Sequence, residues 1–232
     1  MRDRLAEEHP GTPASLCELD FADPFQLLAA TILSAQTTDV RVNATTPALF
    51  ERFPGPDALA AADPADVEAL IHATGFFRQK AKSLVGMAGA LVERHGGQVP
   101  PDIDALVRLP GVGRKTANVV RSVALGLPGL PVDTHVLRLS ARLGLAQEDD
   151  PVKVEHELGA LVPRADRGML SLRLILHGRR VCVARTPRCD MCVLNDICPS
   201  AFRVGAPPGR PGRRASAQAA QDLVEPAAPG DQ

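Results

Sequence analysis

Signals that start and stop helices recur along this chain at short intervals. Asp-Pro pairs at 23–24, 63–64 and 150–151 place an N-cap acceptor before a proline at the first helical position. Between such signals the apolar residues recur three and four positions apart, and no convincing stretch alternates with the period of a strand. Glycines at 75 and 96–97 are placed to end helices. The sequence therefore predicts an all-α fold of about ten short helices.

The composition is that of an ordinary globular protein, with 232 residues, 45% of them hydrophobic and 23% charged. This length allows one large domain or two small ones. No stretch approaches the roughly 20 apolar residues of a membrane helix. The first residues, "MRDRLAEEHPGTPASLCELD", lack the apolar run of a signal peptide. We therefore expect no membrane association and a cytoplasmic location.

The net charge of −1 conceals a separation of charges. The segment 167–189 contains six arginines and no acidic residue, whereas acids cluster in 146–150 and near the N-terminus. A strongly positive face on a nearly neutral molecule suits a polyanion such as nucleic acid. The alternative is an ordinary solvated surface, and the charge pattern alone leaves both open.

The end of the chain has the composition of a disordered segment. The last thirty residues contain five prolines, four glycines and almost no large apolar side chain. Such a segment cannot bury enough surface to offset its chain entropy. We expect residues 201–232 to form a disordered, low-complexity tail.

Four of the five cysteines fall within seventeen residues, in the pattern C-x6-C-x2-C-x5-C. Without a secretory signal, clustered thiols are more often metal ligands than disulfides. Zinc sites usually use two Cys-x2-Cys pairs, and this segment has only one. The spacing therefore favours a [4Fe–4S] cluster, with zinc as the alternative. The candidate ligands are Cys182, Cys189, Cys192 and Cys198.

The stretch "LPGVGRKT" (109–116) joins two predicted helices. Gly111 and Gly113 allow a tight turn and let an anion approach the backbone N–H groups beside a helix N-terminus. A Walker A loop needs a glycine directly before its lysine and a strand ahead of it, whereas Arg114 and a helix stand here. The segment from about residue 103 to 122 is therefore predicted to form a helix–hairpin–helix that binds a DNA phosphate.

Two further residues are candidates for chemistry. Lys115 lies on the first turn of the second hairpin helix, where the helix dipole and any shielding from water would disfavour its charge and make its amine a nucleophile. Asp133, in "PVDTHVLRL", could orient such a lysine, accept a proton or stabilise a cationic intermediate. The simpler alternatives are a surface lysine that reaches a phosphate and an aspartate that only caps a helix.

The hairpin with Lys115, the "VDTHV" segment and the cysteine spacing together resemble the endonuclease III family of DNA repair enzymes. The segments "LSAQTTDVRVN" (33–43) and "LILHGR" (174–179) extend the resemblance. It implies the helix–hairpin–helix DNA glycosylase fold, with a six-helix barrel domain and a [4Fe–4S] cluster domain. We expect the barrel at 17–127 and the cluster domain at 1–16 and 128–200.

The resemblance also implies a bifunctional DNA glycosylase and AP lyase of base excision repair. Its substrate would be double-stranded DNA with an oxidised pyrimidine or an abasic site, bound by a monomer. Lys115 would attack C1′ and leave a Schiff base that permits β-elimination, with Asp133 assisting. The damaged nucleotide must first leave the base stack.

Three residues are expected to read DNA by the same resemblance. Gln36 matches the family residue that fills the vacated space, and Asp39 matches a pocket residue, although it could equally be a helix cap. Phe76 stands where the family commonly has a leucine wedge, and an aromatic side chain can also wedge between bases. The alternative is that Phe76 belongs to the core.

The cluster is expected to have a structural role. It would order the loop between its first two cysteines, so that Arg185 and Arg188 reach DNA phosphates.

Two other functions compete with this interpretation. One is a mismatch-specific monofunctional glycosylase; the adenine enzymes of that kind lack the hairpin lysine and carry a catalytic glutamate where Thr31 stands here. The other is a non-catalytic iron–sulfur module that only binds DNA, which would need neither Lys115 nor Asp133.

Overall fold

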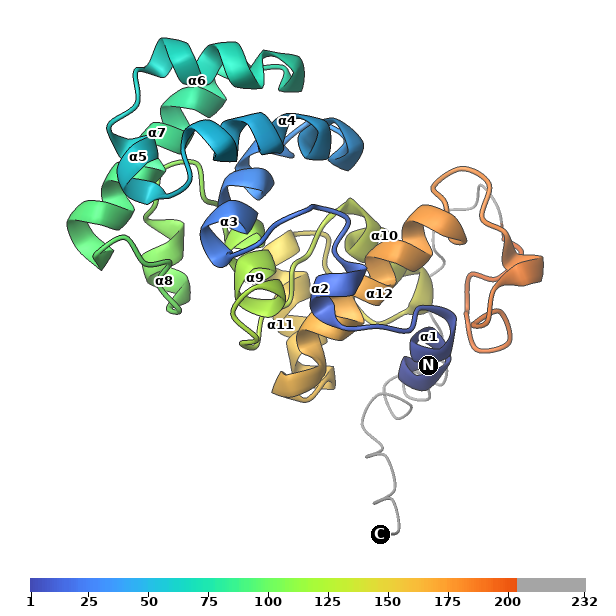
Figure 1. Ribbon diagram of the computed structural model, residues 1–232. Coiled ribbons are helices and arrows are strands. Elements are labelled where there is room, and N and C mark those ends of the chain that lie inside the picture. The colour runs from blue at the N-terminus through green and yellow to red at the C-terminus, as the bar shows by residue number, and fades with distance from the viewer. Residues whose placement is uncertain (204–232) are drawn as a thin grey trace, which may run out of the picture. The chain divides into compact units, whose positions relative to one another are not determined.

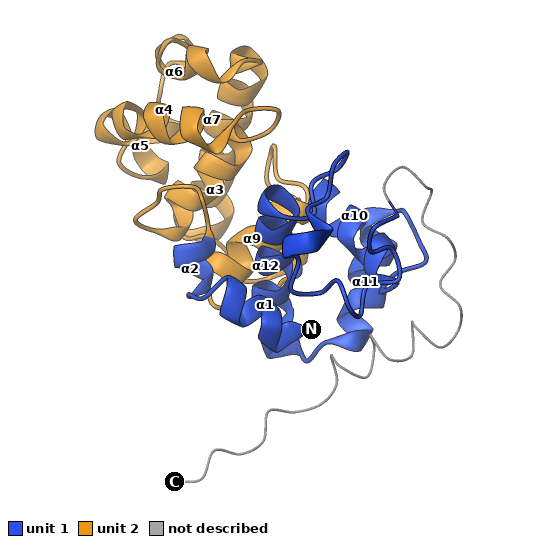
Figure 2. Cartoon of the chain, turned by 90° about the vertical axis from the view of Figure 1, so that its right-hand side faces the viewer, with its two compact units in different colours: residues 1–16, 130–232 blue, residues 17–129 orange. Residues whose placement is uncertain are grey.

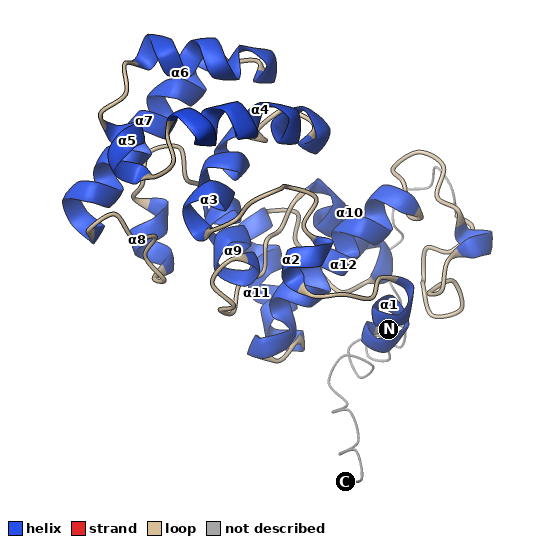
Figure 3. Cartoon of the chain, in the orientation of Figure 1, coloured by secondary structure: helices blue, strands red, loops and turns tan. Residues whose placement is uncertain are grey.

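The computed structural model describes residues 1–203, so the expected tail lies almost wholly outside the described residues. Between residues 1 and 203 the chain is helical, with twelve α-helices, three short 3-10 helices and no strand (Figures 1 and 3). The all-α fold predicted from the sequence is confirmed. Within the same residues, no helix combines the length and the apolar character needed to cross a bilayer.

The chain divides into two compact units (Figure 2). One is continuous and comprises residues 17–129. The other combines residues 1–16 with the described residues from 130 to 203.

The 17–129 unit is built around α3 and the long helix α7. Of the nine residues from Phe25 to Leu33 in α3, all except Gln26 are buried. Helix α7 packs against α3, α5 and α6. The hairpin helices α8 and α9 pack on each other, and α9 also packs on α3. The helices of this unit are α3 (Pro24–Leu33), α4 (Asp39–Arg52), α5 (Pro56–Ala60), α6 (Pro64–Ile71), α7 (Phe77–His95), α8 (Ile103–Val107) and α9 (Arg114–Val123), with a 3-10 helix at His72–Thr74.

The other unit is organised by α12, which packs against α1, α2 and α10. Its apolar core includes Leu5 of α1, Leu139 of α10 and Leu174 of α12, and three of the four clustered cysteines border that core. Its helices are α1 (Arg2–Glu8), α2 (Pro13–Leu16), α10 (Thr134–Leu143), α11 (Pro151–Leu161) and α12 (Arg167–Arg180), with 3-10 helices at Arg164–Asp166 and Cys189–Met191.

The predicted helix starts are confirmed at the level of single hydrogen bonds. The side chains of Asp23, Asp63, Asp133 and Asp150 each accept a hydrogen bond from the backbone of the helix that they precede. The end predicted at Gly75 differs in detail, because α6 stops at Ile71 and a 3-10 turn intervenes. Gly75 then has a φ of 68° with a ψ of 160°, which lies outside the left-handed helical conformation that commonly ends a helix.

Candidate functional site

The turn between α8 and α9 uses its two glycines differently. Gly111 has a φ of 77°, and a Cβ placed on it would lie 2.7 Å from Cβ of Ser83 in α7. Only glycine therefore fits both the conformation and the space. Gly113 is the N-cap of α9 with an ordinary φ of −91°, and no atom lies within 4 Å of a Cβ placed there. Its lack of a side chain leaves the first N–H groups of α9 open to a ligand.

Lys115 is the second residue of α9, and its side chain is exposed. Within residues 1–203 its ammonium group has no hydrogen-bond or salt-bridge partner in the protein. Lys115 lies on the first turn of α9, where the helix dipole acts on its side chain, as the sequence predicted. The protein does not shield this side chain from water. Such shielding has to come from a bound ligand.

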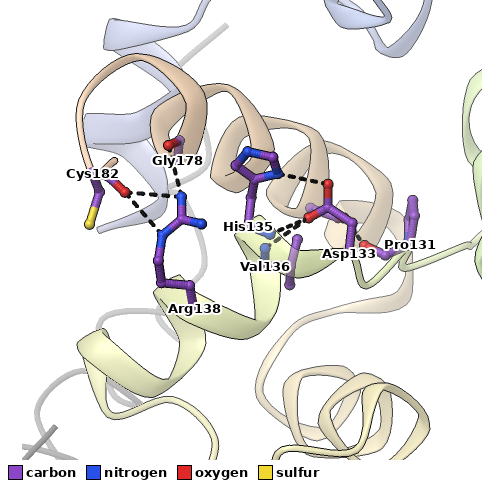
Figure 4. Close-up of polar contacts among 8 residues, drawn as sticks. Pro131, Asp133, His135, Val136, Arg138, Gly178 and Cys182 are labelled. Carbon is purple, nitrogen blue, oxygen red and sulfur yellow. Dashed lines mark hydrogen bonds and ion pairs between the residues drawn. The ribbon is translucent and has the colours of Figure 1, made fainter. Parts of the chain in front are cut away.

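Asp133 both caps α10 and engages a histidine (Figure 4). Its Oδ1 accepts hydrogen bonds from the backbone N–H groups of His135 at 2.8 Å and Val136 at 3.0 Å. Its Oδ2 lies 3.0 Å from Nδ1 of His135, and the aspartate side chain is only 15% exposed. The sequence pattern "VDTHV" assigned no role to His135, although its position two residues after an N-cap is a signal that could have identified it.

The helix that Asp133 caps, α10, also holds the start of the cysteine segment. Arg138 donates from Nη2 to the carbonyl oxygens of Gly178 at 2.9 Å and Cys182 at 3.1 Å (Figure 4). Arg142, one turn further along, donates from Nη1 to Sγ of Cys182 at 3.2 Å and from Nη2 to the carbonyl oxygen of Ala184 at 2.6 Å. Sequence reasoning missed both arginines, although their spacing of four residues places them on one helix face.

Gly178 of α12 allows this part of α12 to lie directly against α10. A Cβ at this position would lie 2.9 Å from Cβ of His135 and 3.1 Å from Nη2 of Arg138. A side chain at position 178 would therefore displace His135, which contacts Asp133, and Arg138, which binds the start of the cysteine segment.

The four clustered cysteines are available as ligands of one metal centre. All four are half-buried, and none forms a disulfide. Thiolates are soft ligands that suit both zinc and iron–sulfur centres. The single Cys-x2-Cys pair among the four favours the iron–sulfur cluster.

Burial around these cysteines also favours a cationic metal centre. Burial raises the pKa of the Cys192 thiol to about 11, with a smaller opposing effect from the backbone N–H of Leu194. A thiolate there needs compensating positive charge, which bound iron supplies. Nε2 of His177 lies 3.3 Å from Sγ of Cys192, and Nδ1 of the same ring lies 2.7 Å from Oε2 of Glu8.

Of the residues expected to read DNA, Gln36 and Phe76 share an unusual backbone conformation. Their φ values are 56° and 47°, and the side chain of Phe76 is exposed, with a relative accessibility of 69%. The interpretation of Phe76 as a core residue is therefore wrong. Gln36 is also exposed. A residue with a Cβ adopts the left-handed conformation only at an energetic cost. Such residues therefore occur mostly where the surrounding structure imposes the conformation.

The remaining expected residues are simpler to describe. Thr38, not Asp39, is the N-cap of α4, because its Oγ1 accepts from the N–H of Arg41 at 3.4 Å. Asp39 is the first residue of the helix proper. Arg185 and Arg188 lie in the cysteine loop with exposed side chains.

Comparison with known proteins decides the family. A family model described as the HhH-GPD superfamily of base excision DNA repair proteins matches residues 29–164, and a model of the iron–sulfur binding domain of endonuclease III matches residues 182–198. Endonuclease III of Synechocystis sp. (strain PCC 6803) is 53% identical over 190 residues, which cover 82% of this chain and 87% of that protein. The chain belongs to the endonuclease III family.

Solved structures of endonuclease III agree with this assignment. A non-covalent endonuclease III–DNA complex matches with a TM-score of 0.81 and 39% identity, over 87% of this chain and 94% of that one. A trapped endonuclease III–DNA covalent intermediate matches with a TM-score of 0.81 and 40% identity over the same shares.

The expectations for fold, enzyme class and cofactor are confirmed. This member of the endonuclease III family has the helix–hairpin–helix glycosylase fold and carries a [4Fe–4S] cluster. It is a DNA glycosylase and AP lyase of base excision repair. The two competing functions, a monofunctional mismatch glycosylase and a non-catalytic module, are not favoured.

Proposed function

We propose that this enzyme excises oxidised pyrimidines from double-stranded DNA with Lys115 as the nucleophile. The observation that carries the proposal is the exposed, unpartnered amine of Lys115 on the first turn of α9, next to the open backbone of Gly113. An amine without a protein partner is available to a substrate atom. The covalent intermediate trapped between a related endonuclease III and DNA is consistent with such a nucleophile.

Lys115 forms the covalent link in the proposed reaction. The amine reacts in its neutral form, so its ammonium group first gives up a proton to a base. The neutral amine then attacks C1′ of the damaged nucleotide. The bond between C1′ and the base breaks, and the base leaves with the electron pair and takes up a proton. Opening of the sugar ring gives the Schiff base.

Strand cleavage follows from the same intermediate. The Schiff base acidifies the proton on C2′, and loss of that proton expels the 3′ phosphate by β-elimination. Asp133 accepts the proton from Lys115 or stabilises the positive charge that develops at the sugar. The two backbone N–H groups that bind its Oδ1 hold the carboxylate in one orientation.

Other residues bind and open the duplex. The exposed N–H groups at Gly111 and Gly113 bind a phosphate, Gln36 fills the space of the extruded nucleotide and Phe76 wedges between bases. Asp39 lines the base pocket. The cluster, held by the four cysteines, orders the loop from which Arg185 and Arg188 reach phosphates. The enzyme acts as a monomer on DNA in the cytoplasm.

Borohydride trapping tests the proposal. Wild-type protein and the Lys115→Ala variant are compared on duplex DNA with one thymine glycol or one abasic site, and Lys82→Ala serves as a control because Lys82 is also exposed. We expect a covalent adduct with wild type and Lys82→Ala only. An adduct of equal yield with Lys115→Ala, or none with cluster-loaded wild type, would contradict the assignment of Lys115.

A further inference from the structure

Lys80 of α7 is a buried lysine without an acidic partner. Its side chain is 5% exposed, and no carboxylate within residues 1–203 pairs with it. Its Nζ donates three hydrogen bonds, each 2.8 Å long, to the carbonyl oxygen of Leu33, Oγ1 of Thr37 and the carbonyl oxygen of Thr74. Burial lowers the pKa of Lys80, while the three oxygen acceptors favour its charged form.

The three acceptors come from two segments that are distant in the sequence. Leu33 and Thr37 flank the turn that carries Gln36, and Thr74 lies two residues before Phe76. Thr37 also donates from Oγ1 to the carbonyl oxygen of Thr74, so the two segments are bonded to each other as well as to Lys80. One ammonium group therefore fixes the distance between the two turns.

The backbone at these turns needs such a constraint. Of the residues from 1 to 203, three that are not glycine have a positive φ, and Gln36 and Phe76 are two of them. Both side chains are exposed, so their own packing does not impose the conformation. Hydrogen bonds around the turns have to hold it.

Filling space does not by itself explain a lysine at this position. An apolar side chain of similar volume would occupy the same core site without the cost of removing a charge from water. The ammonium group of Lys80 supplies three hydrogen-bond donors on one atom, which can bind three acceptors at once. An apolar side chain supplies none.

We propose that Lys80 is a positioning residue for DNA reading, which holds the Gln36 and Phe76 turns in one fixed arrangement so that both side chains enter the duplex together. The inference rests on the proposed roles of Gln36 and Phe76. It adds that neither residue acts alone, because one buried cation sets the spacing between them.

The test compares a damaged base that must be extruded from a duplex with an abasic site in a single strand, which needs no extrusion. Lys80→Met removes the three donors but keeps an aliphatic stem. Thr37→Val keeps the lysine but removes one of its acceptors, together with the hydrogen bond from Thr37 to Thr74. Lys82→Met, an exposed lysine of the same helix, controls for loss of charge. Two rates are measured under single-turnover conditions: base excision from a thymine glycol duplex, and cleavage of a single-stranded oligonucleotide with an abasic site.

A spectroscopic readout follows base unstacking directly. In the duplex, 2-aminopurine is placed beside the lesion, and its fluorescence is recorded at saturating protein in the Lys115→Ala background. Because this signal needs binding but no covalent step, it reports on Lys80 even if Lys115 is not the nucleophile. Failure of the borohydride experiment would therefore count against the proposed function and not against this inference.

We expect Lys80→Met to slow excision from the duplex by about 10- to 100-fold, as displaced catalytic or binding groups commonly do, with little change on the single strand. The fluorescence increase should be reduced in Lys80→Met and, to a smaller extent, in Thr37→Val, but not in Lys82→Met. If both rates fall by the same factor, Lys80 has only a structural role and the inference fails. The inference also fails if Lys80→Met and Thr37→Val both keep the wild-type ratio of duplex excision to single-strand cleavage. If Lys80→Met does not fold with its cluster, Thr37→Val decides by the same two measurements.

Discussion

Nη1 of Arg142 donates a hydrogen bond to Sγ of Cys182 at 3.2 Å, from the helix whose first turn is capped by Asp133. The same guanidinium also binds the carbonyl oxygens of Val183 and Ala184. One helix therefore connects an expected catalytic carboxylate to an expected cluster ligand. These hydrogen bonds tie the start of the cysteine segment to the helix that Asp133 caps.

Replacing Arg142 with methionine should weaken retention of the cluster. Hydrogen bonds from outside the ligand set commonly change metal affinity by about 10- to 100-fold, so we expect iron to be lost to a chelator about tenfold faster. Absorbance near the visible band of the cluster follows the loss. Arg164→Met, at an exposed site of the same unit, should lose iron at the wild-type rate; equal rates in all three proteins would contradict the role of Arg142.

Gly178→Ala should destabilise the unit that contains Asp133. The added Cβ would lie 2.9 Å from Cβ of His135, and such overpacking typically costs about 1–3 kcal/mol. Urea unfolding followed by circular dichroism measures the change in the free energy of unfolding. Gly89→Ala is the matched control, since a Cβ at that helical position meets no atom within 4 Å and should be neutral or stabilising. A Gly178→Ala protein as stable as Gly89→Ala would refute the close approach.

Two substitutions of Asp133 separate its capping from its chemistry. Asparagine can still accept the capping hydrogen bonds but cannot take a proton or balance a cation, so Asp133→Asn should keep stability and lose most excision activity. Asp133→Ala should lose activity and also about 1 kcal/mol of stability with the cap. Single-turnover excision and urea unfolding provide the two measurements. Full activity in the asparagine variant would reduce Asp133 to a helix cap.

The loop arginines should determine part of the salt dependence of DNA binding. Each phosphate contact contributes about 0.9 to the slope of log affinity against log salt concentration. Replacing both Arg185 and Arg188 with glutamine should therefore reduce that slope by about 1.8, whatever the sequence of the DNA. Fluorescence anisotropy at several salt concentrations measures the slope. An unchanged slope would remove both residues from the interface.

His9 should make the protein less stable in mild acid. Burial lowers the pKa of His9 from its ordinary 6.5, and His177, Arg173 and Arg180 add to the effect while Glu8 opposes it. The unfolded chain therefore binds the proton more tightly, and the free energy of unfolding falls as the pH drops below about 6.5.

The variant His9→Gln, which cannot titrate, should show a smaller decrease over the same pH range. His156→Gln, at an exposed histidine, is the control and should follow the wild type. Urea unfolding at several pH values decides between them; identical pH dependence in His9→Gln and wild type would exclude His9 as the source.

The features that the sequence predicted well are local. An aspartate that caps a helix accepts a hydrogen bond from a backbone N–H two or three residues later. Oδ1 of Asp23, for example, accepts from the N–H of Gln26 at 2.8 Å, so both partners belong to one short segment of the sequence. Spacing along the chain likewise singled out the hairpin glycines, Lys115 and the four cysteines. The match to the iron–sulfur domain of endonuclease III confirms the cluster, whereas the roles of the individual residues stay predictions.

Only the tertiary structure decided which side chains are buried and what they bind. Nothing in "GFFRQKA" distinguishes Lys80 as buried or Phe76 as exposed, because burial depends on helices that the segment packs against. Lys80 binds an oxygen 47 residues away, and Arg138 binds one 44 residues away. The sequence by itself thus determined the helices, the cluster motif and the family. Packing between distant segments determined how the turns at Gln36 and Phe76 and the start of the cysteine segment are held.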